Sequence, residues 1–347
     1  MAKAKSGPVT MAVAGLGRAG WNIHVSAIRG RKDFVLTEVM DLDESRLSEA
    51  EAEFGCCTYR DWGKFLRESK AELVVVATQS QDHARMSWQA LEAGKNVLVE
   101  KPMATRLRDI DRMIAAAEAS GKLLTVHQSA RMAPEYWFIQ DVVRSGVLGR
   151  IFSIKHGSYG FGRRNDWQTL RKYGGGQLNN NGVHIIDQVV QLIDSPITQV
   201  FGDLQQVLNP GDCEDHVKVV FRAENGVVAD IEITTACALP LPSWVLMGTR
   251  GTLISDGTNA RLRYTEAKKL PALKPIDSIA AVGRKYGTGE NLTFTEETRP
   301  ASLTPPKNFY DYLYDSLRKG KPLLVTPESS QRTMQVMQLA RKCTPFA

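Results

Sequence analysis

Residues 13–20 read Val-Ala-Gly-Leu-Gly-Arg-Ala-Gly, and this stretch decides the fold of the first part of the chain. The glycine spacing follows an apolar run at residues 10–14 and opens a helix that the pattern predicts at 19–28. In this context the first glycine permits a tight turn, the second lets the backbone approach a pyrophosphate, and the third lets helix and strand pack closely. The helix N-terminus then faces the phosphates. A dinucleotide is therefore predicted to bind at Gly15, Leu16, Gly17, Arg18, Ala19 and Gly20.

Asp41 is a second sequence feature that predicts dinucleotide binding. It lies 21 residues after Gly20, at the end of a predicted strand at 35–40. An acid at that point accepts hydrogen bonds from the ribose hydroxyls and repels a 2′-phosphate, so we expect NAD in preference to NADP. Arg46 follows closely and keeps NADP open as the less favoured cofactor.

The surrounding sequence alternates between short apolar runs and amphipathic stretches. Such short, nearly continuous apolar runs are typical of strands buried on both faces of a parallel sheet. We therefore predict an α/β fold with an N-terminal Rossmann domain at residues 1–128. The predicted strands are 10–14, 35–40, 73–77, 96–99 and 123–126, and the predicted helices are 19–28, 45–54, 82–93 and 108–119.

Beyond residue 128 the short apolar runs give way to longer stretches that are rich in β-branched residues. The strands at 216–221 and 227–234 are joined through Asn225-Gly226, a strong hairpin signal. We predict a second α/β domain at 129–347, with a large, mostly antiparallel open sheet for substrate binding and oligomerisation. Its last helix is expected to pack back on the first domain. The other predicted elements are a strand at 151–159, helices at 135–145, 307–318 and 328–341, and a loop at 270–289.

Composition narrows the class of protein. The 44 Lys and Arg outnumber the 38 Asp and Glu by six, but they are scattered, and no module that reads nucleic acid is recognisable, so we expect no nucleic-acid partner. No stretch reaches the roughly 18 apolar residues of a membrane helix, so no membrane partner is expected. An odd count of five cysteines without CxxC spacing predicts neither a disulfide framework nor a metal site. The chain is expected in the cytoplasm.

The predicted strand at 96–99 is followed by Glu100-Lys101-Pro102. Ligands of open parallel sheets bind beyond the carboxyl ends of the strands, so Glu100 and Lys101 are expected beside the nicotinamide. A lysine there can donate a hydrogen bond to a substrate oxygen and stabilise charge that develops during hydride transfer. The alternative is a solvated lysine at a strand end, and the pattern alone does not decide between the two.

A second polar segment runs from Gly174 to Asp187. If a helix begins near Asn179, then Asn180, His184 and Asp187 fall on one face, opposite an apolar face with Val183 and Ile186. An ordinary surface helix has the same pattern.

Upstream of Gly174, an aromatic and cationic stretch could stack on a sugar ring and bind its hydroxyls or an anionic group. The alternative is an exposed loop without a binding role. Its candidate substrate-binding residues are Tyr159, Arg163, Arg164 and Trp167.

These segments together resemble the Gfo/Idh/MocA oxidoreductases, the family of glucose–fructose oxidoreductase and inositol dehydrogenase. The resemblance runs over nearly the whole chain and includes the glycine turn, Asp41, Glu100-Lys101-Pro102, the 174–187 segment and residues 248–253. It implies that Thr78, Gln79 and His83 also contact the cofactor, and that Arg131 lines the substrate pocket. The family usually has Thr-Pro where this chain has Thr78-Gln79.

The resemblance also implies catalytic roles. The family pattern after the three glycines places an Asp and a His beside the lysine, and the His carries over to His184. The Asp does not, because Asn180 stands there, and an amide can hold a hydroxyl but cannot take its proton near neutral pH. Proton transfer is therefore assigned to His184 and Lys101, with Asp187 as a further catalytic residue that orients the imidazole.

The resemblance predicts an NAD(H)-dependent oxidoreductase that acts on a hydroxyl of a sugar, sugar derivative or cyclitol. Family members commonly pair through the open sheet, so a homodimer or homotetramer is expected. One alternative is an NAD-dependent glycoside hydrolase, which oxidises the sugar transiently, eliminates the aglycone and adds water. Another is a non-catalytic protein that senses NAD.

Overall fold

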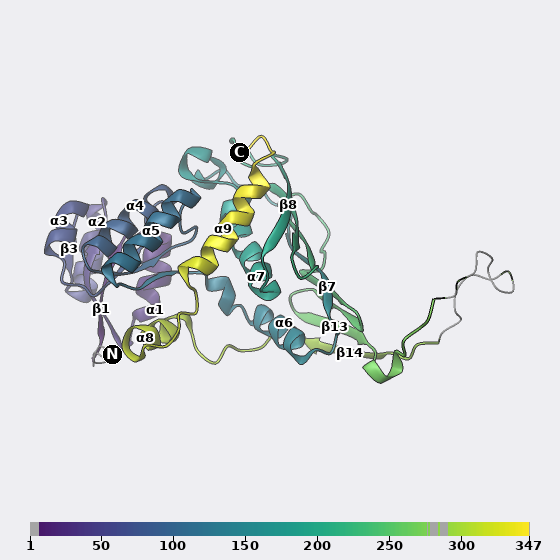
Figure 1. Ribbon diagram of the computed structural model, residues 1–347. Helices are drawn as coiled ribbons and strands as arrows, with labels where there is room; N and C mark the ends of the chain where they lie inside the picture. Colours follow the sequence, from purple (N-terminus) through teal and green to yellow (C-terminus); the bar gives the residue numbers. More distant parts are fainter. Residues whose placement is uncertain (1–6, 276, 278–283, 285–290, 347) are drawn as a thin grey trace.

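The computed structural model describes residues 7–275, 277, 284 and 291–346, and two β-sheets organise it. Figure 1 shows the first sheet and its helices on the left, the second sheet on the right, and helices α6, α7 and α9 between them. These three helices are α6 (Pro134–Ser145), α7 (Val183–Ile193) and α9 (Pro327–Arg341).

The first sheet has six parallel strands in the order β3-β2-β1-β4-β5-β6. Its central strands are buried on both faces, as in β4, where all four residues are buried. This explains their continuous apolar sequences. The strands are β1 (Val9–Ala14), β2 (Phe34–Met40), β3 (Cys57–Tyr59), β4 (Leu73–Val76), β5 (Asn96–Val99) and β6 (Leu124–Val126).

Helices cover both faces of this sheet. Asp43 and Asp61 accept hydrogen bonds from backbone N–H groups in the first turns of α2 and α3, which fixes where those helices begin. The helices are α1 (Ser26–Ile28), α2 (Glu44–Phe54), α3 (Trp62–Glu68), α4 (Ser80–Glu92) and α5 (Leu107–Ser120). The Rossmann domain and its parallel sheet are thereby confirmed, and the predicted elements agree to within one or two residues except at the first helix.

The second sheet has eight strands in the order β14-β13-β12-β11-β7-β10-β9-β8, antiparallel except for β7 beside β10. Buried and half-buried residues alternate along β9 and β10 because one face packs on helices and the other is open. The predicted Asn225-Gly226 hairpin joins these two strands. The strands are β7 (Ile151–Tyr159), β8 (Ile197–Gln205), β9 (His216–Ala223), β10 (Val228–Thr234), β11 (Trp244–Gly248), β12 (Gly251–Ser255), β13 (Asn259–Tyr264) and β14 (Thr295–Pro300).

The last two helices return to the first domain. Helix α8 (Phe309–Lys319) places Tyr310 against Phe34 of β2, and Arg318 forms a two-bonded ion pair with Glu72. Helix α9 packs against α5 and β6 on one side and against α7 and β8 on the other. The helix that was expected to pack back on the first domain therefore spans both domains.

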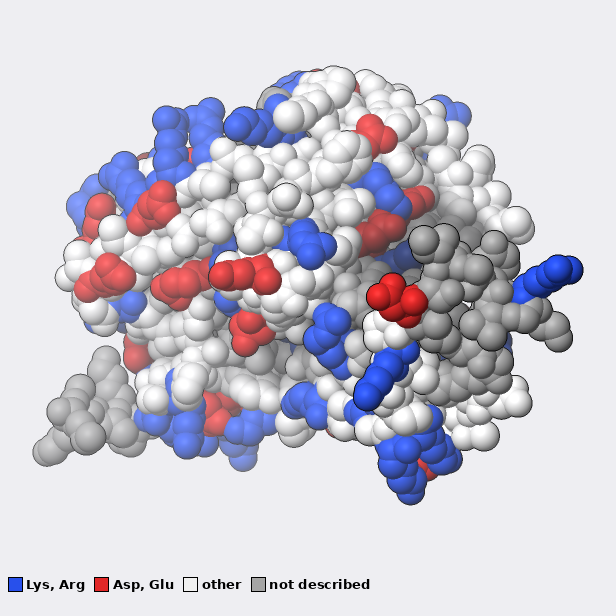
Figure 2. All heavy atoms as spheres, turned by 45° about the vertical axis from the view of Figure 1, so that its right-hand side comes forward, with Lys and Arg blue, Asp and Glu red and all other residues white. Residues whose placement is uncertain are grey.

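Part of the predicted loop at 270–289 lies outside the described residues; residues 270–275 have no regular structure. Within the described chain, none of the helices combines the length and apolar character of a membrane span. On the face that Figure 2 shows, Lys and Arg form several separate groups interspersed with acidic side chains, as expected from their scatter along the sequence.

Candidate functional site

The turn after β1 has the geometry of a phosphate cradle. Gly15 has φ +92°, and a Cβ built on it would lie 2.6 Å from the carbonyl oxygen of Ala77. A Cβ on Gly20 would lie only 1.8 Å from the carbonyl oxygen of Gly15. By contrast, no heavy atom lies within 4 Å of a Cβ built on Gly17, so the backbone there faces open space. A pyrophosphate can approach at Gly17, and the turn therefore fits a dinucleotide.

Asp41 holds this turn against the end of β2. Its Oδ2 accepts the N–H of Leu16 at 2.6 Å, and its Oδ1 accepts the N–H of Asp43 at 2.9 Å. The Arg46 guanidinium lies 3.5 Å from the same carboxylate. A buried carboxylate at the carboxyl end of β2 is placed where the ribose of a bound dinucleotide would lie.

The helix after the glycine turn differs from the prediction. Instead of one α-helix over 19–28, a π-helical segment, η1 (Gly20–Val25), is followed by the short helix α1. The wider turns bring His24 into the interior, where its exposed fraction is zero. Single π-turns of this kind are frequent at functional sites.

Lys101 lies at the boundary between the two domains. Its backbone follows β5 and is joined to Pro102 by a cis peptide bond, and its Nζ donates a hydrogen bond to the carbonyl oxygen of Asn180 at 3.0 Å. Burial lowers the pKa of the Lys101 ammonium; the negative charge of Glu100 opposes this shift, and the positive charge of Arg18 adds to it. Lys101 is thus a positioned amine that loses its proton more easily than a solvated lysine.

The structure corrects the expectation that Glu100 faces the cofactor. Its Oε1 accepts hydrogen bonds from His24 Nε2 at 3.0 Å and from His127 Nδ1 at 2.8 Å, and its Oε2 accepts the N–H of Lys101. Burial opposes ionisation of this carboxyl, but the two histidines hold its pKa well below its usual range. Glu100 therefore anchors the backbone of Lys101 from inside the protein.

His24, Glu100 and His127 are also the three side chains, among the described residues, whose ligand atoms cluster within 4.8 Å as a metal site would require. They are hydrogen-bonded to one another, and His24 Nδ1 lies 2.8 Å from the hydroxyl of Tyr310. The carboxylate and the hydroxyl satisfy the buried ring nitrogens of His24, so these residues form a closed polar network.

His83 is likewise a supporting residue. Its ring nitrogens lie 2.8 Å from the carbonyl oxygen of Pro102 and 3.1 Å from that of Thr78, and burial lowers its pKa. It ties the turn after β4 to the turn after β5. Gln79 next to Thr78 accepts a hydrogen bond from Gln81, so the Thr78-Gln79 turn is held by side chains of its own helix α4.

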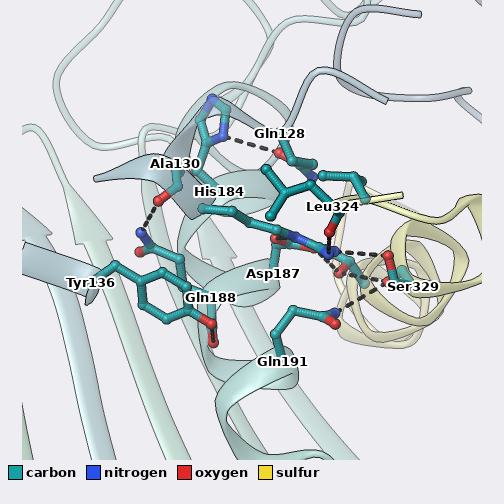
Figure 3. Close-up of polar contacts among 12 residues, drawn as sticks. Gln128, Ala130, Tyr136, His184, Asp187, Gln188, Gln191, Leu324 and Ser329 are labelled. Carbon is teal, nitrogen blue, oxygen red and sulfur yellow. Dashed lines mark hydrogen bonds and ion pairs between the residues drawn. The ribbon is translucent and has the colours of Figure 1, made fainter. Parts of the chain in front are cut away.

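His184 lies in the first turn of α7, after a π-helical segment, η5 (Leu178–Gly182). Its Nδ1 lies 3.1 Å from Oε1 of Gln128, and Gln128 Nε2 donates to the carbonyl oxygen of Val183. Because an amide oxygen only accepts, Nδ1 carries the proton in this contact, and Nε2, which points away from Gln128 (Figure 3), is left as an acceptor.

Burial and the nearby charge of Lys101 lower the pKa of His184 to about 3. The imidazole is therefore neutral at physiological pH and can accept a hydrogen bond, but it holds a proton poorly. The side-chain oxygen of Asn180, one turn earlier, accepts from Gln168 Nε2 at 3.3 Å. Gln128 and Gln168 were not singled out from the sequence, although Gln128 follows β6 just as Lys101 follows β5.

Asp187 does not orient His184, which corrects the catalytic role assigned to it. Its exposed fraction is zero, and its two oxygens accept from Arg131 Nε and Nη2 at 2.7 and 2.8 Å. Thr333 of α9 donates to the same carboxylate, and Arg131 also bonds Ser329 and the carbonyl of Leu324. Figure 3 shows Asp187, Ser329 and Leu324 around this ion pair. Helix α7 is buried almost all round, so the expected polar face is enclosed by protein and Asp187 is used in an internal ion pair.

The aromatic and cationic segment after β7 is only partly near this site. The Tyr159 ring folds over Gly157, close to Lys218 and Glu232 of the open sheet face, so it points away from α7. Arg163 is exposed, and Arg164 forms a two-bonded ion pair with Asp166.

Trp167, the next residue after Asp166, is 49 % exposed. The charge of Arg18 helps to lower the pKa of Asp166, after the larger effect of Arg164. This segment therefore lies near the arginine of the glycine turn.

Comparison with known proteins agrees with this geometry. Residues 9–128 match the model of the oxidoreductase family with an NAD-binding Rossmann fold, and residues 136–254 match the GFO/IDH/MocA C-terminal domain. The chain belongs to the Gfo/Idh/MocA oxidoreductase family, and its first domain binds NAD.

Three similar proteins illustrate the family. The uncharacterized oxidoreductase YhhX of Escherichia coli is 26% identical over 80% of each chain. The myo-inositol 2-dehydrogenase of Thermotoga maritima is 23% identical over 95% of this chain and 94% of its own. A WlbA dehydrogenase from Bordetella pertussis, solved in complex with NADH and UDP-GlcNAcA, is 20% identical with a TM-score of 0.75, covering 96% of this chain and 97% of its own.

Proposed function

We propose that this oxidoreductase transfers a hydride reversibly between a hydroxyl-bearing carbon of a sugar, sugar derivative or cyclitol and NAD. The observation that carries the proposal is the amine of Lys101, which is held on Asn180 at the interdomain boundary with a lowered pKa. Relatives named as inositol dehydrogenases support the substrate class. The glycine turn and Asp41 would hold the cofactor, which, when bound, supplies the hydride acceptor.

The chain's own residues handle the proton. As the C–H hydride leaves with its electron pair, the hydroxyl proton passes to the neutral amine of Lys101, and the carbinol becomes a carbonyl. The pKa of Lys101 is shifted toward the working pH, which suits a general base. In the reverse direction the ammonium returns the proton to the carbonyl oxygen.

His184 and Asn180 would position the same hydroxyl. The unprotonated Nε2 of His184 accepts its hydrogen bond, and the Asn180 side chain offers a further amide contact. Because the pKa of His184 is about 3, a proton that it receives is passed on, and Lys101 is the group that retains it. We expect the exposed Trp167 and the Arg163 and Arg164 side chains to contact the rest of the sugar.

We expect NAD in preference to NADP because the Asp41 carboxylate would repel a 2′-phosphate. The Arg46 guanidinium, 3.5 Å away, reduces this preference without reversing it. All five cysteines are free thiols, which fits a reducing compartment such as the cytoplasm.

The test is absorbance at 340 nm with free sugars, cyclitols and aryl glycosides, on wild type and on Lys101→Met. We expect NADH to accumulate with a free sugar or cyclitol, and kcat/KM to fall roughly 10²–10⁴-fold in the variant while NADH affinity is unchanged. Lys95→Met is the matched control, because Lys95 lies beside the opposite end of β5 and also has a pKa lowered by burial. Equal activity of Lys101→Met and wild type would contradict the proposal.

A second candidate function is an NAD-dependent glycoside hydrolase. The observation that favours it is Asn180, which replaces the carboxylate of the family pattern and leaves Lys101 and His184 for proton transfers at several steps. Release of aglycone from an aryl glycoside without net NADH would establish this function. Tightly bound NADH with neither reaction would favour a sensor.

We further propose a homodimer or homotetramer that pairs through the open face of the second sheet. Phe201 of β8 and Ile254 of β12 are exposed on that face, at 62 and 43 % of their surface. Large apolar side chains exposed on an open sheet are typical of interfaces. Light scattering should give a mass of two or four chains, and Phe201→Glu should shift it toward one chain.

A further inference from the structure

A groove of about 990 Å³ lies apart from the proposed reaction site. Three segments supply most of its lining: the first turn of α5, the turn that carries Arg171 and Gly174, and the C-terminal end of α9. Its lining includes neither the glycine turn nor Asp41, so it is distinct from the cofactor cradle. A volume of this size accommodates a ligand as large as a nucleotide.

The charges that line the groove are strongly unequal. Five cations face a single carboxylate, that of Glu214, and the cations come from all three segments. They are Arg106, Arg171, Lys172, Arg341 and Lys342. Arg106 and Lys342 are exposed and, within the described part of the chain, have no ion-pair partner. Cations that converge from separate segments favour a ligand with more than one negative group.

Arg341 is a second feature of the groove that favours an anion. Its side chain is half-buried, and its Nη2 donates to the Asn179 side-chain oxygen at 2.7 Å. No carboxylate among the described residues lies within ion-pair distance of it. Burial lowers its pKa, and the more distant charge of Glu214 offsets this only in part. Partial burial disfavours a cation that has no counter-ion, and an anion in the groove would supply one.

Glu214 does not fill that role. Its Oε1 accepts the N–H of Leu178 at 3.1 Å, and burial raises the pKa of its carboxyl. The carboxylate is therefore committed to the backbone of η5 and is more readily neutralised than a solvated glutamate. A ligand that brings negative charge would meet little repulsion from it.

Helix α5 contributes a further attraction. It is 14 residues long, and the residue at its N-cap, Arg106, makes no side-chain capping bond to its first N–H groups. The first turn of α5 lines the groove. Uncapped N–H groups and the helix dipole favour an anion at this place.

We propose that this groove is a binding site for a polyanionic phosphate ester or diphosphate, separate from the cofactor cradle. The anion has two conceivable sources, the phosphate-bearing part of a sugar substrate or a free phosphate metabolite. Both sources have the same recognition chemistry: guanidinium and ammonium groups around phosphate oxygens, with Arg341 at the base.

The test is calorimetric titration of pyrophosphate into the full chain saturated with NADH, so that the glycine turn is occupied. We expect saturable binding that weakens with added salt and a Kd at least ten-fold higher in the double variant Arg106→Gln/Lys342→Gln. The matched control is Arg150→Gln/Lys155→Gln, which removes two exposed charges outside the groove and should keep the wild-type Kd.

The exposed pair is substituted because loss of Arg341 alone could disturb folding. Absence of binding, or an equal loss in both double variants, would overturn the proposal. NADH affinity, measured on the same samples, separates failure of the groove from failure of the cofactor site.

Kinetics then identify the source of the anion. If pyrophosphate competes with a sugar nucleotide, raising KM at constant kcat, the groove holds the substrate's own diphosphate. If it changes kcat with a neutral cyclitol, a separate metabolite occupies the groove. Either result supports the site.

Discussion

Arg131 and Asp187 form a two-bonded ion pair that is fully enclosed where the two domains meet, with N–O distances of 2.7 and 2.8 Å. One partner follows the last strand of the first sheet, and the other lies in α7 beneath the second sheet. Ser329 and Thr333 of α9 bond to the same pair. The pair joins three elements that are far apart in the sequence.

Removing the carboxylate of Asp187 should therefore lower the free energy of unfolding. Asp187→Ala leaves the Arg131 charge buried and unpaired, and we expect the free energy of unfolding to fall by about 3–5 kcal/mol. Glu53→Ala, which breaks the exposed two-bonded pair with Arg29, is the matched control and should cost less than about 1 kcal/mol. Urea unfolding measures the free energy of unfolding of both variants. Equal decreases in the two variants would show that burial of the Arg131–Asp187 pair does not add to its effect on stability.

Alanine substitutions at Gly17 and Gly20 of the glycine turn are expected to affect different properties, NADH affinity in the first case and stability in the second. Gly17→Ala places a methyl group in open space, so stability should be kept while NADH affinity falls roughly 100-fold, about 2.7 kcal/mol. Gly20→Ala places it 1.8 Å from the Gly15 carbonyl oxygen and should lower stability by roughly 3 kcal/mol or more. Fluorescence titration and thermal unfolding separate the two; unchanged NADH affinity in Gly17→Ala would place the phosphates elsewhere.

Asp41 is expected to set the cofactor preference. Asp41→Ser removes the charge that repels a 2′-phosphate, so the ratio of NADPH to NADH affinity should rise by roughly ten-fold or more. Glu44→Ala, an exposed acid in the first turn of α2, should leave the ratio unchanged. A constant ratio in Asp41→Ser would show that Arg46 or the turn itself governs the preference.

The buried histidines predict a pH dependence of stability. His184 has a pKa of about 3 in the folded protein and about 6.5 when unfolded, so only the unfolded chain takes up its proton as the pH falls below 6.5. The free energy of unfolding should then decrease, and His184 alone accounts for about 2 kcal/mol between pH 8 and 5.

His184→Asn isolates this contribution from those of His24, His83 and His156, whose pKa values are also lowered by burial. Urea unfolding at pH 5 and 8 should show a smaller difference between the two pH values in the variant than in wild type. The same difference in both proteins would show that His184 titrates normally in the fold.

Local patterns were sufficient to predict the first domain apart from β3 and α3, because buried parallel strands and glycine turns leave continuous signals in the sequence. The same holds for Lys101, which the end of a strand places without reference to distant residues. By contrast, β8, β11, β12, β13 and β14 escaped prediction. Strand β14, for example, is mostly exposed at the sheet edge, and its charged residues leave no apolar alternation.

The partners of the buried polar side chains in the site could not be predicted from sequence spacing. Glu100 and Asp187 are polar residues whose partners come from distant parts of the chain: His24 for the first, Arg131 and Thr333 for the second. A helical pattern places Asp187 on the same face as His184, but it contains no information that an arginine 56 residues away would enclose it. Long-range pairing decided which predicted site residues face substrate and which support them.

Helix α9 has a consequence for how the whole molecule melts. It bonds to Asp111 of α5 through Gln331 and to Asp187 of α7 through Thr333, so neither domain can lose its structure without releasing the other. Calorimetry should record one endotherm with equal calorimetric and van't Hoff enthalpies, although the chain has two sheets. NADH, which binds the first domain, should then raise the melting temperature of both.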